Sequence, residues 1–252
     1  MTVNVAKKSG LVSAKFTIES EHFSCSFRVS VPSGSTTLAD LLPIARSLSD
    51  AIVQQTARAV RDSGEQISCT SGCGACCRNL VAITEVEARR IGDVLVRLPE
   101  PRRSTVLGRF SEARDQLDRA GLLQQLQSPE HCTPDDYSSL VGTYFSQGIA
   151  CPFLEQESCT IYDERPLGCR EYLVTSSPAL CARLDSTGVC KVKLPFTVFN
   201  AVARVGNPSQ GAFCEKWVPL ILAPQWAKTH PEQPEPRPGL ELLQELLGHL
   251  NA

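Results

Sequence analysis

The sequence predicts a mainly α-helical protein of the α+β class, with a small N-terminal β-hairpin and metal-binding loops between the helices. Three observations predict this class. Apolar and polar residues alternate in two short N-terminal stretches, apolar residues recur at helical spacing further on, and glycine and proline interrupt two cysteine-rich segments. We expect three domains: residues 1–64 with the hairpin and a helix, residues 65–215 with the cysteines, and residues 216–252 with a spacer and a final helix.

The N-terminal stretches "AKFTIES" and "SCSFRVSVP" flank "EHF" and predict a hairpin over residues 14–31. The turn residues of "PSGSTT" end it. Apolar side chains then recur at three- and four-residue intervals as far as Asp62, at Leu38, Leu41, Leu42, Ala45, Leu48, Ile52, Val53 and Val60. Thr37 and Asp40 have the spacing of a capping box, so an amphipathic helix is expected to begin here.

Further helices are expected after the cysteine run at residues 69–77. Thr84 and Glu87 form a capping box before a helix that Pro99 and Pro101 end, and a third helix is expected over residues 104–127. Residues 128–150 show little pattern and are expected to be a loop.

The C-terminal part is expected to contain two more helices. "LPFTVFNAVARVG" predicts a helix over residues 196–205, and "HPEQPEPRPG" predicts a proline-rich spacer. The tail "LELLQELLGHL" has the pattern of an amphipathic helix. Because its apolar stripe is narrow, we expect it to pack onto its own domain, although it is also the candidate surface for a protein partner.

Composition excludes several classes of function. A formal net charge of −2 gives no reason to expect nucleic acid or an anionic membrane as a partner, and no apolar run reaches the length of a membrane helix. The N-terminus lacks a signal-peptide pattern, so we expect a cytoplasmic protein. In that reducing compartment the 12 cysteines are expected to be ligands or redox groups and not disulfides.

Seven cysteines gather in two segments that are separated by some seventy residues. "CTSGCGACC" places four thiols in nine positions, and "CPFLEQESCTIYDERPLGC" adds three, giving Cys69, Cys73, Cys76, Cys77, Cys151, Cys159 and Cys169. Converging thiolates repel one another unless a cation neutralises them, and thiolate is the soft ligand of zinc and of iron–sulfur clusters. Gly72 and Gly74 indicate a loop wrapped around a centre and not a regular helix. With only four histidines in the chain, a metal site here is expected to consist mostly of thiolate.

These motifs resemble the bacterial YkgJ-type cysteine-cluster family, described as a zinc- or iron-chelating domain with a CxxCxxCC signature. The resemblance covers roughly residues 65–175 and includes "CTSGCGACCRNLVAIT" and "CPFL…C…IYDERPLGCR" in the same order. It implies that the seven cysteines bind the metal. The first gap departs from the signature, with three residues between Cys69 and Cys73 where the signature has two. Members of the family lack an established reaction, so the resemblance implies a site but no substrate.

The other cysteines receive separate interpretations. Cys181 and Cys190 follow the second segment closely, and either is a candidate for an eighth thiolate; our metal set includes Cys181. Eight thiolates would suit two four-thiolate centres, whereas seven would suit one centre with thiols left over for redox or bridging roles. We expect Cys25, Cys132 and Cys214 to be structural.

Several polar residues lie beside the expected ligands. Arg170 directly follows Cys169 and is our candidate cofactor-binding residue, since a guanidinium offsets thiolate charge; Arg78 is in the same position after Cys77. We expect Glu85 and Glu87 to stabilise a helix N-terminus and not to act in catalysis.

The sequence therefore predicts a metal-binding protein with a cysteine cluster. Its two loops are expected to hold either an iron–sulfur cluster, for which 4Fe–4S is the candidate type, or Zn²⁺. A redox role is the candidate downstream function. One alternative is a structural or adaptor module stapled by zinc. The other is an enzyme related to radical S-adenosylmethionine enzymes or to flagellin lysine N-methylases. The spacing Cys69-x₃-Cys73-x₂-Cys76 favours the enzyme, but Ala75 replaces the aromatic residue usual there and no barrel of strand–helix units is predicted. No catalytic residue is assigned.

Overall fold

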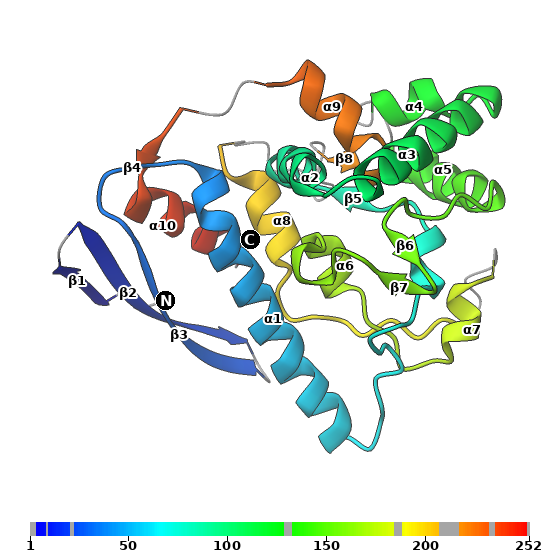
Figure 1. The fold of residues 1–252 in the computed structure, drawn as a ribbon. Coiled ribbons are helices and arrows are strands. Elements are labelled where there is room, and N and C mark those ends of the chain that lie inside the picture. The colour runs from blue at the N-terminus through cyan, green and yellow to red at the C-terminus, as the bar shows by residue number, and fades with distance from the viewer. Residues whose placement is uncertain are drawn as a thin grey trace. The chain divides into compact units, whose positions relative to one another are not determined.

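The computed structural model describes residues 4–8, 10–20, 23–128, 133–183, 188–206, 217–231 and 235–250. Their contacts define two compact units, which are residues 1–65, 193–210 and 232–252 for the first and residues 66–192 and 211–231 for the second (Figure 1). The protein is mainly helical with a small N-terminal antiparallel sheet, as predicted. The three domains expected from the sequence stay a prediction, because contacts within the folded chain do not show which parts of it fold on their own.

The first unit contains a three-stranded antiparallel sheet in the order β1-β2-β3, with strands Asn4–Lys8, Leu11–Ser20 and Phe23–Pro32. Apolar and polar residues alternate along β2, and side chains of a strand point alternately to its two faces. The strand therefore buries one face, at Val12, Ala14, Phe16 and Ile18. Phe16 lies opposite Phe27 of β3 with ring centroids 5.3 Å apart. The predicted hairpin is confirmed, and β1 adds a third strand that the sequence analysis missed. Cys25 lies in β3 opposite Ile18.

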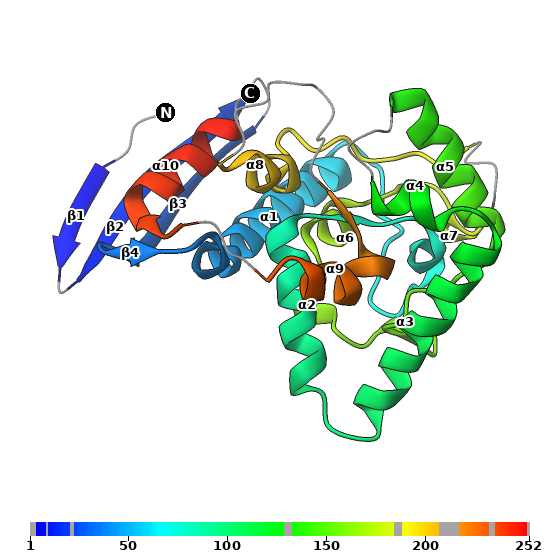
Figure 2. The same cartoon turned by 90° about the horizontal axis from the view of Figure 1, so that it is seen from above.

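The described part of the first unit has three helices, α1 (Leu38–Asp62), α8 (Val198–Arg204) and α10 (Gly239–His249). Two of them, α1 and α10, pack against β3 of the sheet, and the third, α8, packs against these two helices. The short strands β4 (Ser35–Thr36) and β9 (Arg237–Pro238) pair with each other. The capping box of Thr37 and Asp40 is present. Figure 2 shows α10 lying along the sheet, where it packs against β3, α8 and α1. The tail helix therefore returns onto its own unit, as expected.

The second unit has a helical framework around short loops. Its longer helices are α2 (Glu85–Arg97), α3 (Arg102–Arg119), α4 (Leu123–Gln127), α5 (Pro134–Ser146) and α9 (Ala223–Thr229). Its short elements are η1 (Ala75–Arg78), β5 (Ala82–Ile83), β6 (Leu154–Glu155), β7 (Ser158–Cys159), η3 (Tyr162–Glu164), α6 (Leu167–Glu171), α7 (Pro178–Cys181), β8 (Val218–Pro219) and η4 (Leu220–Leu222). The capping box of Thr84 and Glu87 begins α2, as predicted. None of the helices in the described ranges is long and apolar enough to cross a membrane.

The single helix predicted over residues 104–127 is wrong. The structure has α3 as far as Arg119 and a separate α4 that begins at Leu123. Gly121 lies between them with φ of +71°, a left-handed conformation that ends a helix and that glycine adopts without steric cost.

The loop predicted over residues 128–150 is also wrong, because α5 occupies much of it. Thr133 caps the helix, the Asp136 side chain completes a capping box, and Pro134 lies in the first turn, where proline is tolerated. Leu140 and Tyr144 are buried one helical turn apart. The sequence analysis missed this capping box, although its pattern is the same as that of α1.

Candidate metal-binding site

The first cysteine segment is a wrapped loop. The amide of Cys73 donates to the Thr70 carbonyl at 3.1 Å, and the amide of Cys77 donates to the Gly74 carbonyl at 3.0 Å. Cys76 and Cys77 lie in the 3₁₀ turn η1, and Gly72 has φ of +87°. The prediction of a loop in place of a regular helix is therefore confirmed, and it brings four half-buried thiols into one short stretch.

The three cysteines of the second segment have different local structures. Cys151 precedes β6, Cys159 ends β7, and Cys169 lies in α6. The two strands form a tight hairpin whose turn residues, Gln156 and Glu157, both have positive φ. Paired left-handed residues are the geometry that two-residue hairpin loops require, so this turn sets the separation of Cys151 and Cys159.

The two segments meet directly through the backbone. The Cys151 amide donates to the Cys77 carbonyl at 2.7 Å. The Arg78 guanidinium donates to the Gly74 carbonyl at 3.0 Å and to both carboxylate oxygens of Glu157 at 3.1 and 2.6 Å. A Cβ added to Gly74 would lie 3.0 Å from the Glu157 carbonyl and 2.7 Å from the ends of the Glu157 and Leu154 side chains, so a larger residue here would require these neighbours to shift. Arg78 thus joins the segments, which is a structural role for one of the two candidate arginines.

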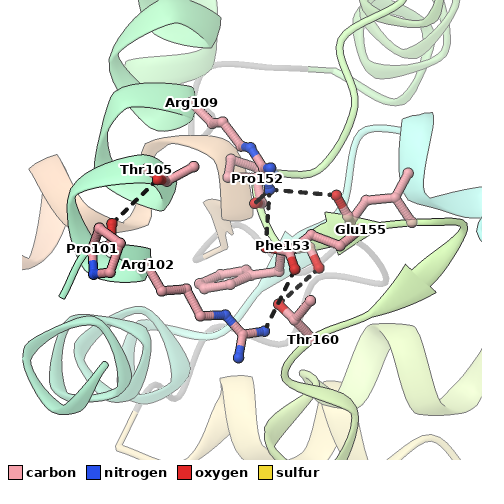
Figure 3. Close-up of polar contacts among 9 residues, drawn as sticks. Pro101, Arg102, Thr105, Arg109, Pro152, Phe153, Glu155 and Thr160 are labelled. Carbon is pink, nitrogen blue, oxygen red and sulfur yellow. Dashed lines mark hydrogen bonds and ion pairs between the residues drawn. The ribbon is translucent and has the colours of Figure 1, made fainter. Parts of the chain in front are cut away.

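Arginines of α3 hold the hairpin of the second segment from its other side (Figure 3). Arg109 donates to the Pro152 carbonyl at 3.1 Å and to the Glu155 carboxylate at 3.3 Å. Arg102 lies 3.9 Å from the same carboxylate. Phe153, which is 1% exposed, packs edge-on against Phe110 of α3 at 5.5 Å between centroids. These contacts anchor the stretch between Cys151 and Cys159 to a long helix.

Glu87 fixes the position of α6 and therefore of Cys169. Its carboxylate accepts hydrogen bonds from the Thr84 amide and hydroxyl, at 3.0 and 2.9 Å, and from the Leu167 amide at 2.6 Å. Glu87 is 1% exposed and serves two helix N-termini at once. The expectation that it caps a helix is confirmed, and the second helix is a role that the sequence analysis missed.

The chain after α6 returns to the first segment. Ser68 donates from its amide to the Val174 carbonyl at 2.9 Å and from its hydroxyl to the Thr175 carbonyl at 3.0 Å. Helix α7, which ends at the buried Cys181, packs against η1. Cys190 is exposed, and its thiol lies 3.6 Å from the Gly188 carbonyl.

Burial and mutual repulsion raise the pKa of several of these thiols. Burial raises the pKa of Cys151 to about 12, and the charges of Cys159 and Cys76 add to the shift. The pKa of Cys76 is raised first by its hydrogen bond with Cys77 and then by burial. For Cys69, Cys159, Cys169 and Cys181, burial raises the pKa most, and the charge of Cys76 raises each of them further. Cys76 is therefore within electrostatic reach of both segments and of Cys181.

Arg165 and Arg170, which precede and follow Cys169 in the sequence, differ in their surroundings. Arg170 is buried and donates through Nε to the Arg165 carbonyl at 2.9 Å and through a terminal nitrogen to the Asp163 carbonyl. The positive charge of Arg165 lowers the pKa of Cys69, Cys76 and Cys159. Arg165 is a residue to which the sequence analysis gave no role, because its sequence position alone does not show where its side chain points.

The donor set suits a soft metal. All ten described cysteines are free thiols. Within the described ranges, no group of three or more His, Cys, Asp or Glu side chains has the geometry of a formed metal site. Burial raises these pKa values most and repulsion between the thiolates adds to it; a bound cation would favour the ionised thiols, because divalent metals and iron–sulfur centres bind thiols in the deprotonated form. Cys132 and Cys214, which we expected to be structural, lie outside the described residues.

Comparisons with known proteins agree with this donor set. Residues 68–191 match the family CxxCxxCC, described as "Putative zinc- or iron-chelating domain". No curated protein and no solved structure matches the chain. The match spans both cysteine segments, α7 and the bridge between Val174 and Lys191. Residues 68–191 of the chain therefore match the CxxCxxCC family.

Proposed function

We propose that the second unit binds an iron–sulfur cluster through thiolates of its two cysteine segments and of α7. The ligands are drawn from Cys69, Cys73, Cys76, Cys77, Cys151, Cys159, Cys169 and Cys181. The observation that carries the proposal is geometric: the Cys151 amide donates to the Cys77 carbonyl and α7 packs against η1, so both cysteine segments and α7 meet at one short turn. Thiols that oppose one another's ionisation become stable ligands when a metal centre takes up their charge.

Two features favour iron–sulfur over zinc. All eight candidate ligands are thiols, and iron–sulfur clusters are held by cysteine thiolates almost exclusively, whereas zinc also takes histidine and carboxylate ligands. His230, the described histidine of this unit, is stacked on the Trp226 ring at 4.4 Å between centroids. Cys181 is preferred to Cys190 as the eighth ligand because α7 packs against η1, whereas the Cys190 side chain is exposed. A cluster in this site would give the protein a redox role.

The test is metal and sulfide analysis of the full chain, purified without oxygen and without a metal-binding tag. We expect iron with matching acid-labile sulfide and a broad absorption band near ~400 nm that dithionite bleaches. One or two zinc ions per chain and no colour would overturn the cluster and support a zinc-stapled structural module. Neither metal would overturn metal binding itself.

Cysteine variants show whether the metal is held where we propose. Cys76→Ser is expected to lose most of the bound iron, because Cys76 interacts with thiols of both segments. Cys190→Ser is the matched control, because that thiol is exposed, and it should keep the iron and sulfide content of the unmodified protein. Equal losses in both variants would contradict the proposed ligand set.

A further inference from the structure

A guanidinium with an unpartnered donor lies between the cysteines of the second segment. Arg165 follows η3, between Cys159 and Cys169 in the sequence, and its guanidinium carbon lies 4.1 Å from the centroid of the Tyr162 ring. Its Nε is buried and has no hydrogen-bond partner among the described residues. A buried donor without a partner is costly, so such an atom in a folded protein calls for an explanation.

The backbone around Arg165 is fixed by a second arginine. Arg170 donates to the carbonyls of Arg165 and Asp163, and the Arg165 amide donates to the Tyr162 carbonyl at 3.4 Å. Stacking on Tyr162 holds the plane of the guanidinium. The Arg165 side chain is thus positioned by contacts that leave its Nε–H available to another acceptor.

An arginine that binds the neighbouring residue Glu164 shows the usual alternative. Arg90 of α2 binds the Glu164 carboxylate through two nitrogens, at 3.1 and 2.5 Å. Glu164 immediately precedes Arg165 in the sequence. Glu164 is ion-paired with Arg90, whereas the next residue, Arg165, has a buried Nε without a hydrogen-bond partner among the described residues. Arg90 has a carboxylate as its counter-charge, whereas the guanidinium of Arg165 makes no ion pair with a carboxylate in the part of the chain that the structure describes.

We propose that Arg165 is the internal counter-charge of the cysteine centre and donates its Nε–H to a thiolate sulfur of the loaded centre. The proposal rests on the metal-binding function proposed above. Four thiolates around a divalent metal, or around a cluster core of the same charge, leave a net charge of about −2, which a guanidinium partly offsets. Arg165 is a positioning residue: it favours the ionised thiolates and lowers the electron density on sulfur.

The test compares Cd²⁺ binding by the full chain and by three variants, after the native metal has been removed. Arg165→Met removes the charge and the donor, Arg165→Lys keeps a charge but not the planar donor, and Arg90→Met is the control that removes a paired arginine nearby. Cd²⁺ affinity is measured by competition with a chelator, and the sulfur-to-metal charge-transfer band is recorded in the ultraviolet. Circular dichroism reports whether each variant is folded.

We expect Arg165→Met to weaken Cd²⁺ binding by about 10- to 100-fold, as losses of outer contacts to metal ligands do, and to shift the charge-transfer band. Arg165→Lys should be intermediate, and Arg90→Met should match the unmodified protein. If Arg165→Met does not fold, Arg165→Lys decides: weaker binding with native helix content supports the proposal. Unchanged affinity and band in the folded Arg165 variants would overturn it while leaving metal binding intact. Absence of Cd²⁺ binding by the unmodified chain would overturn both.

Discussion

The N-terminal sheet with its helices and the two cysteine segments are stabilised by different interactions. In the first unit, α10 contributes a row of leucines with exposures of 0–4% at Leu242, Leu243, Leu246 and Leu247, and each such side chain contributes about 1.5–3 kcal/mol when fully buried. The cysteine segments consist of two-residue strands, single turns and loops joined by hydrogen bonds and arginine–carboxylate contacts. The first region is stabilised mainly by the burial of apolar side chains, whereas the second contains thiols that repel one another when ionised.

Removal of the metal is expected to have the largest effect, because it should destabilise the cysteine segments and leave the first unit unchanged. A structural metal contributes on the order of 10 kcal/mol of apparent binding energy, and that contribution should act on the cysteine segments alone. We expect chelation to increase amide hydrogen exchange over residues 68–78 and 151–171 and to leave α1 and α10 unchanged. Hydrogen exchange followed by mass spectrometry measures both regions in one sample. Equal loss of protection in both regions would contradict the comparison.

Truncation of a core leucine in α10 should have the reverse effect. Leu246 is 1% exposed, so Leu246→Ala is expected to lower the free energy of unfolding by about 2–5 kcal/mol through lost burial and the cavity that remains. Metal content per folded chain should not change. Gln244→Ala, at an exposed position of the same helix, is the matched control and should unfold at nearly the denaturant concentration of the unmodified protein. Metal loss in Leu246→Ala that exceeds the unfolded fraction would show that the two regions depend on each other.

Glycine substitutions test the close approach between the cysteine segments. Gly74→Ala would place a Cβ 3.0 Å from the Glu157 carbonyl and 2.7 Å from its carboxylate, and such overpacking costs about 1–3 kcal/mol. Gly108 lies inside α3 and has nothing within 4 Å of an added Cβ, so Gly108→Ala should stabilise the protein by about 0.5–1 kcal/mol. Opposite changes in the urea midpoint are the expected result. Stabilisation by both substitutions would mean that the segments do not approach closely in solution.

The sequence predicted most of the local structure, because its signals act over a few residues. The capping boxes at Thr37 and Thr84 and the alternation in β2 and β3 each specify an element without help from distant residues. The same logic was available for α5, where Tyr137, Leu140, Val141 and Tyr144 repeat at helical spacing, and its omission was an error of pattern recognition. The break at Gly121 required a specific φ, which a continuous apolar pattern does not reveal.

The candidate site was predictable only in part, because its assembly depends on long-range contacts. Cysteine spacing located both segments, and Gly72 and Gly74 indicated a loop. Nothing local indicated that the Cys151 amide would bind the Cys77 carbonyl or that Arg109 of α3 would hold the second hairpin. Arg165 and Arg170 are equally polar in the sequence, and only the fold distinguishes an arginine that binds backbone carbonyls from one that acts on thiols.

The ion pair of Arg78 and Glu157 gives the smallest expected effect, and its pH dependence sharpens the comparison. The hydrogen bond from Arg78 holds the pKa of the Glu157 carboxyl below its ordinary value, and the charge of Arg78 acts in the same direction. A carboxyl whose pKa is lower in the folded state stabilises the protein above its unfolded pKa, near 4.5, and loses that contribution as the pH falls through the folded pKa. Glu157→Gln should therefore melt slightly below the unmodified protein at pH 7, and the two melting temperatures should converge near pH 3. Because both side chains are partly exposed, raised salt should also reduce the difference. A difference that persists at low pH would mean that the Glu157 side chain acts through packing at Gly74, where it lies 2.7 Å from the position of an added Cβ, and not through its charge.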